Sequence, residues 1–408
     1  GDHRDLHLSI RRQRQMCIRD SEAVLKALDL DPARCLLNLA HTHAGPSLYR
    51  ADHDKPGGHL IAPYLDAIRD AAVTAARAAV SSAQSAHLEW DYGHSALARN
   101  RDLPDPQRPR ILCGFNPAQA ADPTVLVGRA TTTAGQPLAT IVNYACHPTS
   151  LAWENRLISP DYIGALRETV EGYTGAPCLF LQGASGDQAP REQYSGNSAV
   201  ADANGRQLGL AVLATLAGMI APGNSYAFTG PIESGAPLAS WSAQPILPPS
   251  TLAAQVEELT IALKDLPSLA QIDSDLRTCT EHVQSERLRR KRAVRSMVGD
   301  GHQTAVRLWT WRIGDAYIAA QANEAFTDLQ RGLRAQFPGR AIVVLNITNG
   351  GTTGYLPPAV RYDESDMYQV WQTPYARGSL ERVSEAFSRA IESLSENSRT
   401  VSYTHLRA

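Results

Sequence analysis

A stretch near the N-terminus reads Leu36-Leu37-Asn38-Leu39-Ala40-His41-Thr42-His43-Ala44-Gly45-Pro46-Ser47. An apolar run followed by Gly-Pro predicts a buried strand whose end opens into a cleft. Residues i and i+2 of a strand share a face, so we expect His41 and His43 to point the same way. Two imidazoles on one face suit a Zn²⁺ site. Taken alone, His-x-His favours a simpler interpretation, in which one histidine is packed or capped and the other is solvated.

The composition is that of an ordinary globular protein and excludes several classes. The chain has 408 residues, a formal net charge of -2 and 43% hydrophobic residues, which gives no basic surface for nucleic acid. No apolar run is long enough to span a bilayer. The six cysteines include no Cys-x-x-Cys pair, so neither a disulfide framework nor a thiolate zinc site is predicted. The oligomeric state stays open.

The two ends differ from the rest of the chain. Residues 1–21 and 397–408 lack usable periodicity and resemble translated readthrough of sequencing adapters, so we expect both to be non-native. If so, the true N-terminus and any signal peptide are missing. Residues 22–396 are then expected to form the functional domain.

The spacing of apolar residues predicts an α/β protein with mixed sheets flanked by helices and a metal site at the strand ends. A hairpin is predicted across Ala134-Gly135-Gln136-Pro137. The expected helices cover 21–28, 63–85, 159–171, 199–220, 252–263, 272–298, a segment ending at 337, and 379–396. The expected strands cover 35–40, 125–132, 138–145, 178–182, 304–313, 316–320 and 341–348, with one more between 222 and 249. The arginines of 272–298 are interpreted as a solvated face.

Residues with useful chemistry follow several of these strands. His147 comes directly after 138–145, Asp187 lies in a glycine-rich loop after 178–182, and Glu324 follows 316–320. Side chains that converge at one edge of a sheet are typical of α/β active sites. Two histidines and one carboxylate form a common catalytic zinc set. On spacing alone, however, Asp187 is more simply a turn residue, and Tyr355 could pack on Pro357.

Five motifs then point to a family. They are His41-Thr42-His43-Ala44-Gly45-Pro46, Ala145-Cys146-His147-Pro148-Thr149-Ser150, Gly186-Asp187-Gln188-Ala189-Pro190, Asn323-Glu324-Ala325-Phe326 and the loop from Asn349 to Tyr355. In this order they resemble the neutral ceramidases, which are zinc amidases that cleave the N-acyl bond of ceramide. The likeness runs from about Leu36 to Glu396 and is greatest to bacterial ceramidase-domain proteins.

The resemblance implies a role for each matching residue. Its zinc ligands would be His41, His147, Glu324 and Tyr355. The catalytic residues would be His43, which contacts the reacting carbonyl, together with Arg101, Tyr368 and Asp187. The family's Gly-Asp-x-Ser-Pro loop has a serine where this chain has Ala189. The resemblance further implies a small-molecule or lipid N-acyl substrate and a secreted or periplasmic location.

The expected activity is hydrolysis of an N-acyl amide bond by zinc-activated water, because zinc lowers the pKa of bound water to about 7. Two alternatives remain at this point. The chain could be a zinc hydrolase of another amide or ester, which a narrow polar groove beside the metal would favour over an apolar one. It could also be a truncated binding domain without catalysis, which widely separated ligand atoms would favour. A metal-independent serine or cysteine hydrolase is the least expected alternative, because the sequence has neither a Gly-x-Ser-x-Gly elbow nor a suitably placed cysteine.

Overall fold

The computed structural model describes residues 21–46, 48, 52–247, 249–350 and 354–396. Most of the two ends expected to be non-native, 1–20 and 397–408, therefore lie outside the described residues. Ser21 begins a helix over 21–28, as predicted. None of the helices in the described part is both long and apolar enough to cross a membrane. Mixed sheets flanked by helices are present, which confirms the predicted α/β class.

The first sheet has four strands in the order β1-β5-β6-β7. β1 (Ala86–His94) and β6 (Pro137–Tyr144) pair antiparallel with β5 (Thr124–Thr132). β7 (Cys178–Gln182) lies parallel to β6, and the chain reaches it through α3 (Tyr162–Thr174) because a parallel pair needs a crossover. The predicted β5–β6 hairpin is confirmed.

The second sheet repeats this connectivity. β11 (Leu252–Ala262), β12 (Gln303–Ile313) and β13 (Ala316–Gln321) form antiparallel pairs, and β15 (Ala341–Leu345) lies parallel to β13. The crossover helix is α7 (Asp328–Gln336). Each sheet therefore ends in a hairpin, a helix and a parallel strand.

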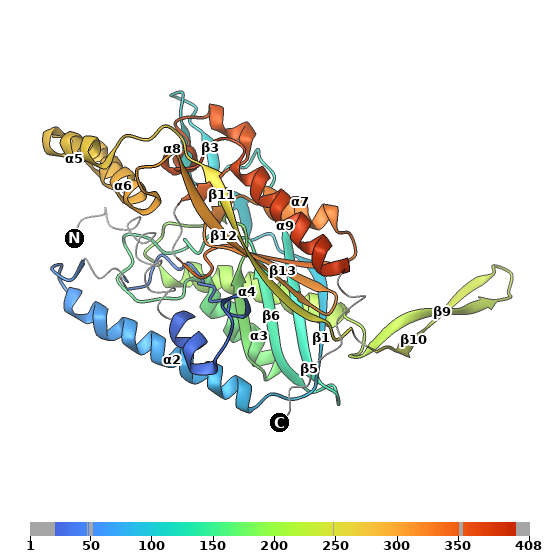
Figure 1. Cartoon of the computed structure of the whole chain (residues 1–408). Coiled ribbons are helices and arrows are strands. Elements are labelled where there is room, and N and C mark those ends of the chain that lie inside the picture. The colour runs from blue at the N-terminus through green and yellow to red at the C-terminus, as the bar shows by residue number, and fades with distance from the viewer. Residues whose placement is uncertain (1–20, 47, 49–51, 248, 351–353, 397–408) are drawn as a thin grey trace.

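The two sheets pack face to face between helices (Figure 1). Alternate residues of β5 serve the two sides: Val125 and Val127 face the cluster with α3 and α4 (Ser198–Gly218), while Leu126 joins Trp309 and Val343 between the sheets. In the second sheet, residues such as Val344 face α7 and α9 (Ser379–Glu396). The period of two along each strand thus builds four layers, helices–sheet–sheet–helices.

A buried amide links the two sheets. Asn143 of β6 donates through Nδ2 to the carbonyl oxygens of Leu181 in β7 (3.1 Å) and Val344 in β15 (2.9 Å). Arg334 donates to its Oδ1 at 3.1 Å. Because a buried amide is costly to leave unsatisfied, these bonds help to fix how the sheets sit on each other.

Further helices and strands surround or connect these elements. The helices are η1 (Pro32–Arg34), η3 (Gly58–Leu60), α2 (Ile61–Ser81), α5 (Leu269–Thr278), α6 (His282–Val298), η4 (Ala359–Asp363) and α8 (Tyr368–Gln372). The strands are β2 (Ala98–Asn100), β3 (Asp102–Pro104), β4 (Ile111–Cys113), β8 (Gln188–Pro190), β9 (Asn224–Ile232), β10 (Leu238–Pro245), β14 (Glu324–Ala325) and β16 (Tyr355–Leu356).

The helix predicted at 252–263 is wrong. These residues form β11, which pairs with β12 along its whole length from Leu252↔Ile313 to Ala262↔Gln303. The segment is rich in alanine and glutamate, which favour helix, but pairing with a neighbouring strand overrides that weak preference. The expected strand and loop between 222 and 249 are instead two paired strands, β9 and β10.

The single basic helix predicted at 272–298 is also wrong. It is two helices, because the side chain of Glu281 caps a new one by accepting from the backbone of Val283 and Gln284. Its arginines are not all on a solvated face. Arg295 is buried and bonds to Asp300 at 3.1 Å.

The opening stretch is extended but is not a regular strand. Its one bridge among the described residues joins Asn38 to Thr348, and the stretch is half-buried. The loop after β15 takes up the remaining backbone groups: Leu39 N–H donates to Ile347 O, and Asn349 contacts Leu37 through its backbone and its side chain. Side-chain bonds replace a strand ladder here, which the apolar pattern alone did not reveal.

Candidate metal centre

The two sheets deliver one donor each from corresponding positions. His147 follows the end of β6 at Tyr144 by three residues, and Glu324 follows the end of β13 at Gln321 by three residues. These residues lie 177 positions apart in the chain. Because the sheets share one connectivity and pack face to face, corresponding strand ends meet at the same edge.

Three imidazoles converge at this edge. One nitrogen from each of His41, His43 and His147 can be chosen so that all three lie within 4.8 Å of one another. The ring centroid of His41 lies 4.9 Å from that of His43 and 4.9 Å from that of His147, and the centroids of His43 and His147 are 5.9 Å apart. His41 and His147 are buried, and His43 is half-buried.

The hydrogen bonds of His147 determine which nitrogen faces the centre. Nδ1 lies 2.7 Å from the carbonyl oxygen of Ser185 and 3.1 Å from that of Gln188. Carbonyl oxygens only accept, so Nδ1 carries the proton and Nε2 carries a lone pair. Burial, together with the nearby Arg101, lowers the pKa of His147 to about 4, so the ring is neutral at pH 7.

The Nε2 lone pair of His147 faces a carboxylate. Glu324 Oε2 lies 2.9 Å from His147 Nε2 and 3.4 Å from His41 Nε2. Burial alone would raise the pKa of Glu324, but the neighbouring His41 holds it well below its usual range. A neutral imidazole lone pair and a carboxylate repel each other unless a cation lies between them. This donor arrangement therefore fits a divalent metal ion.

Two further buried atoms support this fit. His41 Nδ1 and Glu324 Oε1 have no hydrogen-bond partner among the residues that the structure describes. Such groups are rare in protein interiors and indicate a role beyond packing. His41 also adopts a φ of 68°, in the left-handed region that costs a non-glycine residue about 1–2 kcal/mol. His41 and His43 were expected to share a face of a strand, and that reason is wrong, because His41 lies outside any strand and its backbone is in the left-handed region.

The loop that carries these histidines is tied to its neighbours. His43 N–H donates to Pro148 O at 3.4 Å, beside His147. Thr42 Oγ1 donates to Ser159 O at 2.8 Å, and Ser159 N–H donates back to Ala44 O at 3.1 Å. The loop is therefore held next to the His147 segment.

Tyr355 and Arg101 form the next part of the site. In the parallel pair β14–β16, Glu324 and Tyr355 are direct partners, so their side chains lie next to each other. Arg101 donates to Tyr355 Oη (3.1 Å) and through two nitrogens to Gly186 O (2.7 and 3.2 Å). Burial and the charge of Glu324 raise the pKa of Tyr355 well above its usual value, so the phenol is protonated.

Tyr368 packs against Tyr355. Their ring centroids are 5.6 Å apart, and burial raises the pKa of Tyr368 to about 12. Arg290 of α6 donates to Tyr368 Oη at 3.2 Å and is itself paired with Glu286 at 3.1 Å. Arg290 was missed by the sequence interpretation, which placed all of these arginines in solvent.

Asp187 is placed differently from the other expected site residues. Its carboxylate accepts from the backbone N–H and the hydroxyl of Thr327, each at 2.9 Å. Burial raises the pKa of Asp187 to about 7. Its backbone carbonyl accepts from the N–H of Arg101 at 3.0 Å. The side chain thus anchors the segment after Glu324, while the main chain holds Arg101.

The structure therefore brings together most of the expected residues, and it leaves two overlapping donor sets. One is His41, His147 and Glu324, with Tyr355 adjacent. The other adds His43, which the family resemblance assigned to the substrate carbonyl, to His41 and His147. Both sets share His41 and His147, so these two side chains are the centre of any metal site here.

Four solved chains match this fold. One, described as a ceramidase complexed with C2, matches with a TM-score of 0.61 and 16% sequence identity over 96% of this chain and 67% of its own. The neutral ceramidase from Pseudomonas aeruginosa matches with a TM-score of 0.61 and 18% identity over 97% of this chain and 66% of its own. This chain thus spans about two thirds of their length. No family model and no curated protein matches the sequence. The expected resemblance to ceramidases is confirmed at the level of the fold.

Proposed function

We propose that the protein is a zinc-dependent hydrolase that cleaves N-acyl amide bonds in the manner of a ceramidase. The observation that carries the proposal is the convergence of a neutral His147 lone pair, His41 and the Glu324 carboxylate at one buried point. Two nitrogens and one carboxylate oxygen are a common catalytic donor set for Zn²⁺. A zinc ion held there supplies a water of pKa about 7 and polarises a carbonyl oxygen.

The remaining side chains have roles suited to amide hydrolysis. Arg101, held by Gly186 O and Tyr355 Oη, keeps a positive charge beside the phenol. Tyr355, expected as a zinc ligand, lies beside Glu324. Tyr368 stays protonated at neutral pH and can donate a hydrogen bond to a carbonyl oxygen as negative charge develops on it. A single such donor contributes about 3 kcal/mol of transition-state stabilisation. His43, in the loop between His41 and Pro46, is the remaining side chain proposed to contact the substrate carbonyl.

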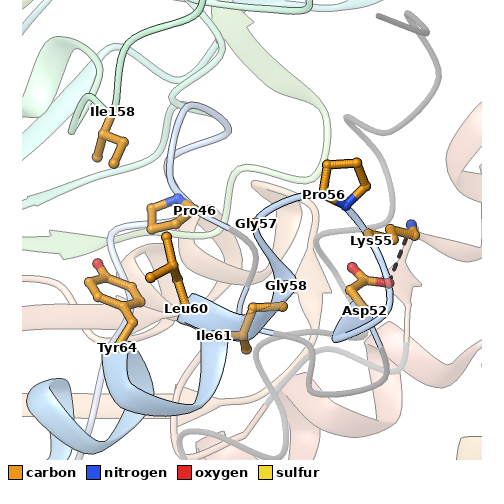
Figure 2. Close-up of a pocket in the computed structure, with 10 residues that line it drawn as sticks. All are labelled: Pro46, Asp52, Lys55, Pro56, Gly57, Gly58, Leu60, Ile61, Tyr64 and Ile158. Carbon is orange, nitrogen blue, oxygen red and sulfur yellow. Dashed lines mark ion pairs between the residues drawn. The ribbon is translucent and has the colours of Figure 1, made fainter.

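A neighbouring groove supports a substrate with an alkyl chain. A groove of about 530 Å³ has apolar walls formed by Pro46, Leu60, Ile61, Tyr64 and Ile158. Figure 2 shows these side chains, with the Lys55–Asp52 pair at one end. Pro46 is three residues from His43, so it lies within about 10 Å of it. Ile158 precedes Ser159, which bonds to the same histidine loop. An apolar groove favours a lipid over a small polar amide.

The alternatives fare less well. A binding domain with widely separated histidines is not supported, because the imidazole nitrogens lie within 4.8 Å of one another. A cysteine nucleophile paired with His147 is not supported either. The Sγ of the adjacent Cys146 contacts His147 O and not its ring, and burial raises the pKa of this thiol well above its usual value. A zinc hydrolase of another amide or ester would be distinguished from a ceramidase-like enzyme by comparing hydrolysis rates on different amide and ester substrates.

The test combines metal analysis with hydrolysis of N-acyl substrates. His41→Ala and His147→Ala should lose zinc and activity together, and a chelator should abolish wild-type activity until zinc is restored. His43→Ala should retain zinc and lose activity, because His43 is proposed to contact the reacting carbonyl and not the metal. Loss of zinc from His43→Ala would move His43 into the ligand set. Full zinc and full activity in His147→Ala would overturn the proposal.

A further inference from the structure

A small cavity lies where α6 packs on α8, next to the α5–α6 pair that projects from the molecule in Figure 1. Its walls come from the segment that follows β11 and from α5, α6 and α8. The volume is about 190 Å³, below the roughly 300–1,000 Å³ of pockets that hold drug-sized ligands. The cavity therefore suits a small ligand.

The lining of this cavity is rich in positive charge. Of the four lysines in the sequence, Lys264 and Lys291 both line it, together with Arg295. Arg295 is already paired with Asp300 at 3.1 Å, whereas neither lysine has an ion pair within the part of the chain that the structure describes. Asp265 also lines the cavity, but it is exposed to water, which screens its charge. Two ammonium groups thus remain for an anion.

Lys264 is held in place and is not free in solvent. The residue is half-buried, and its Nζ donates to the carbonyl oxygen of Val370 in α8 at 2.7 Å. An ammonium has three N–H donors, so two are left for a ligand. Burial, together with the charge of Lys291, lowers the pKa of Lys264 to about 8, so the group is still charged at pH 7. An anion between the two lysines would relieve their repulsion.

A buried acceptor in the same cavity narrows the choice of anion. Gln372 lines the cavity and is 7% exposed, and its Oε1 has no hydrogen-bond partner among the described residues. A buried acceptor is costly to leave unsatisfied. The ligand should therefore bring a hydrogen-bond donor as well as negative charge. Hydrogen phosphate has both, whereas sulfate is fully deprotonated at neutral pH and has no donor.

We propose that this cavity binds inorganic phosphate as hydrogen phosphate. Lys264 and Lys291 donate to its oxygens, as lysines commonly do for phosphate, and Gln372 Oε1 accepts from its hydroxyl. A phosphomonoester fits less well, because the ester carbon replaces the hydroxyl proton and needs more room. A bound phosphate would join the segment after β11 to α6 and α8, outside the proposed metal centre.

Isothermal titration calorimetry of the full chain at pH 7.5 tests this proposal with inorganic phosphate, sulfate and glycerol 3-phosphate. The titrations use both wild type and His147→Ala, because a metal ion at the proposed centre can also take up phosphate. His147→Ala should bind one phosphate per chain, and it should bind sulfate and glycerol 3-phosphate at least tenfold more weakly. Failure of the proposed hydrolysis would leave this result unchanged.

Variants in the same background assign the binding to the cavity. Lys264→Met and Lys291→Met should each weaken phosphate binding at least tenfold, because each removes a charged donor. Arg289→Met is the matched control: it removes the same charge from an exposed position of α6 and should bind phosphate normally. Gln372→Met should lower the affinity for phosphate towards that for sulfate and leave the affinity for sulfate unchanged.

Thermal melting shows which variants remain folded. Lys291 is exposed, so Lys291→Met keeps the test decisive even if Lys264→Met does not fold. Absence of phosphate binding in wild type and His147→Ala would overturn the proposal, as would unchanged binding in a folded Lys291→Met. Sulfate binding as tight as that of phosphate would refute the role of Gln372. Tighter binding of glycerol 3-phosphate would show that the ligand is an ester and not inorganic phosphate.

Discussion

Asp187 is buried against Thr327, and its raised pKa makes stability depend on pH. In the native state it stays protonated up to a pKa of about 7, whereas in the unfolded chain it ionises near its ordinary value of 3.8. The native state then binds more protons between these values, so this residue's stabilising contribution is lost as pH rises from about 4 to about 7. The full effect is on the order of 4 kcal/mol.

Asp187→Asn should remove this dependence. The amide oxygen can still accept from the Thr327 N–H, but it does not ionise. The free energy of unfolding from urea titrations at pH 5 and pH 8 should therefore differ less in the variant than in the wild type. Glu168→Gln, on the exposed side of α3, is the control and should leave the pH dependence unchanged. Equal differences in Asp187→Asn and wild type would show that the carboxylate ionises normally.

Arg290 connects α6 to the site through Tyr368. Its hydrogen bond of 3.2 Å to the phenol fixes Tyr368 beside Tyr355. Arg290→Met should lower kcat about tenfold with little change in KM, since a hydrogen bond to a charged group contributes about 1.5 kcal/mol. Arg290→Lys should recover part of the loss. Arg289→Met, at a more exposed neighbour, should have no effect, and an equal loss there would contradict a specific role for Arg290.

At the scale of elements, α3 and α4 approach closely because of a glycine. A Cβ at Gly205 of α4 would lie 2.2 Å from Tyr162 O and 2.8 Å from Leu166 N, both backbone atoms of α3. Gly205→Ala should therefore destabilise the protein by about 1–3 kcal/mol despite the better helix propensity of alanine. Gly172→Ala, in α3 where the added Cβ meets nothing within 4 Å, should stabilise by about 0.5–1 kcal/mol. Thermal or urea unfolding measures both, and the same sign for both would refute this packing argument.

Element types were predictable where local pattern and tertiary packing agree. The β5–β6 hairpin, β7, β13 and the helices α2, α4 and α9 follow from turn residues and apolar spacing. β11 was mistaken for a helix because its sequence favours helix and only its pairing with β12 decides. The repeated connectivity of the two sheets leaves no trace in sequence spacing, because residues that pack similarly need not be similar.

The sequence predicted some residues of the candidate site and missed others. His147 and Glu324 were expected to converge because both follow strands, but the sequence suggested one sheet edge, and the two residues follow strands of different sheets that pack face to face. Arg290 could not be placed, because its contact depends on how α6 folds back over α8. The engagement of Asp187 with Thr327 likewise depends on the packing of two loops.

At the scale of the whole molecule, a metal ion that binds donors from both sheets should stabilise the fold. Binding only to the native state adds about 4 kcal/mol at a thousandfold excess over the dissociation constant. Chelator-treated protein should therefore melt at a lower temperature, and added zinc should raise Tm in a concentration-dependent way. Magnesium, which prefers oxygen ligands, should not. His147→Ala should show no response to zinc, and a full response there would place the ion elsewhere.

The β9–β10 hairpin connects α4 in the first half of the chain to β11 in the second half. A protease cut at its tip, between Ser234 and Gly235, would leave one piece with His41 and His147 and another with Glu324 and Tyr355. Neither piece alone would hold the complete donor set. The protein could therefore be produced as two fragments, and recovered metal binding would report that the two fragments had reassembled.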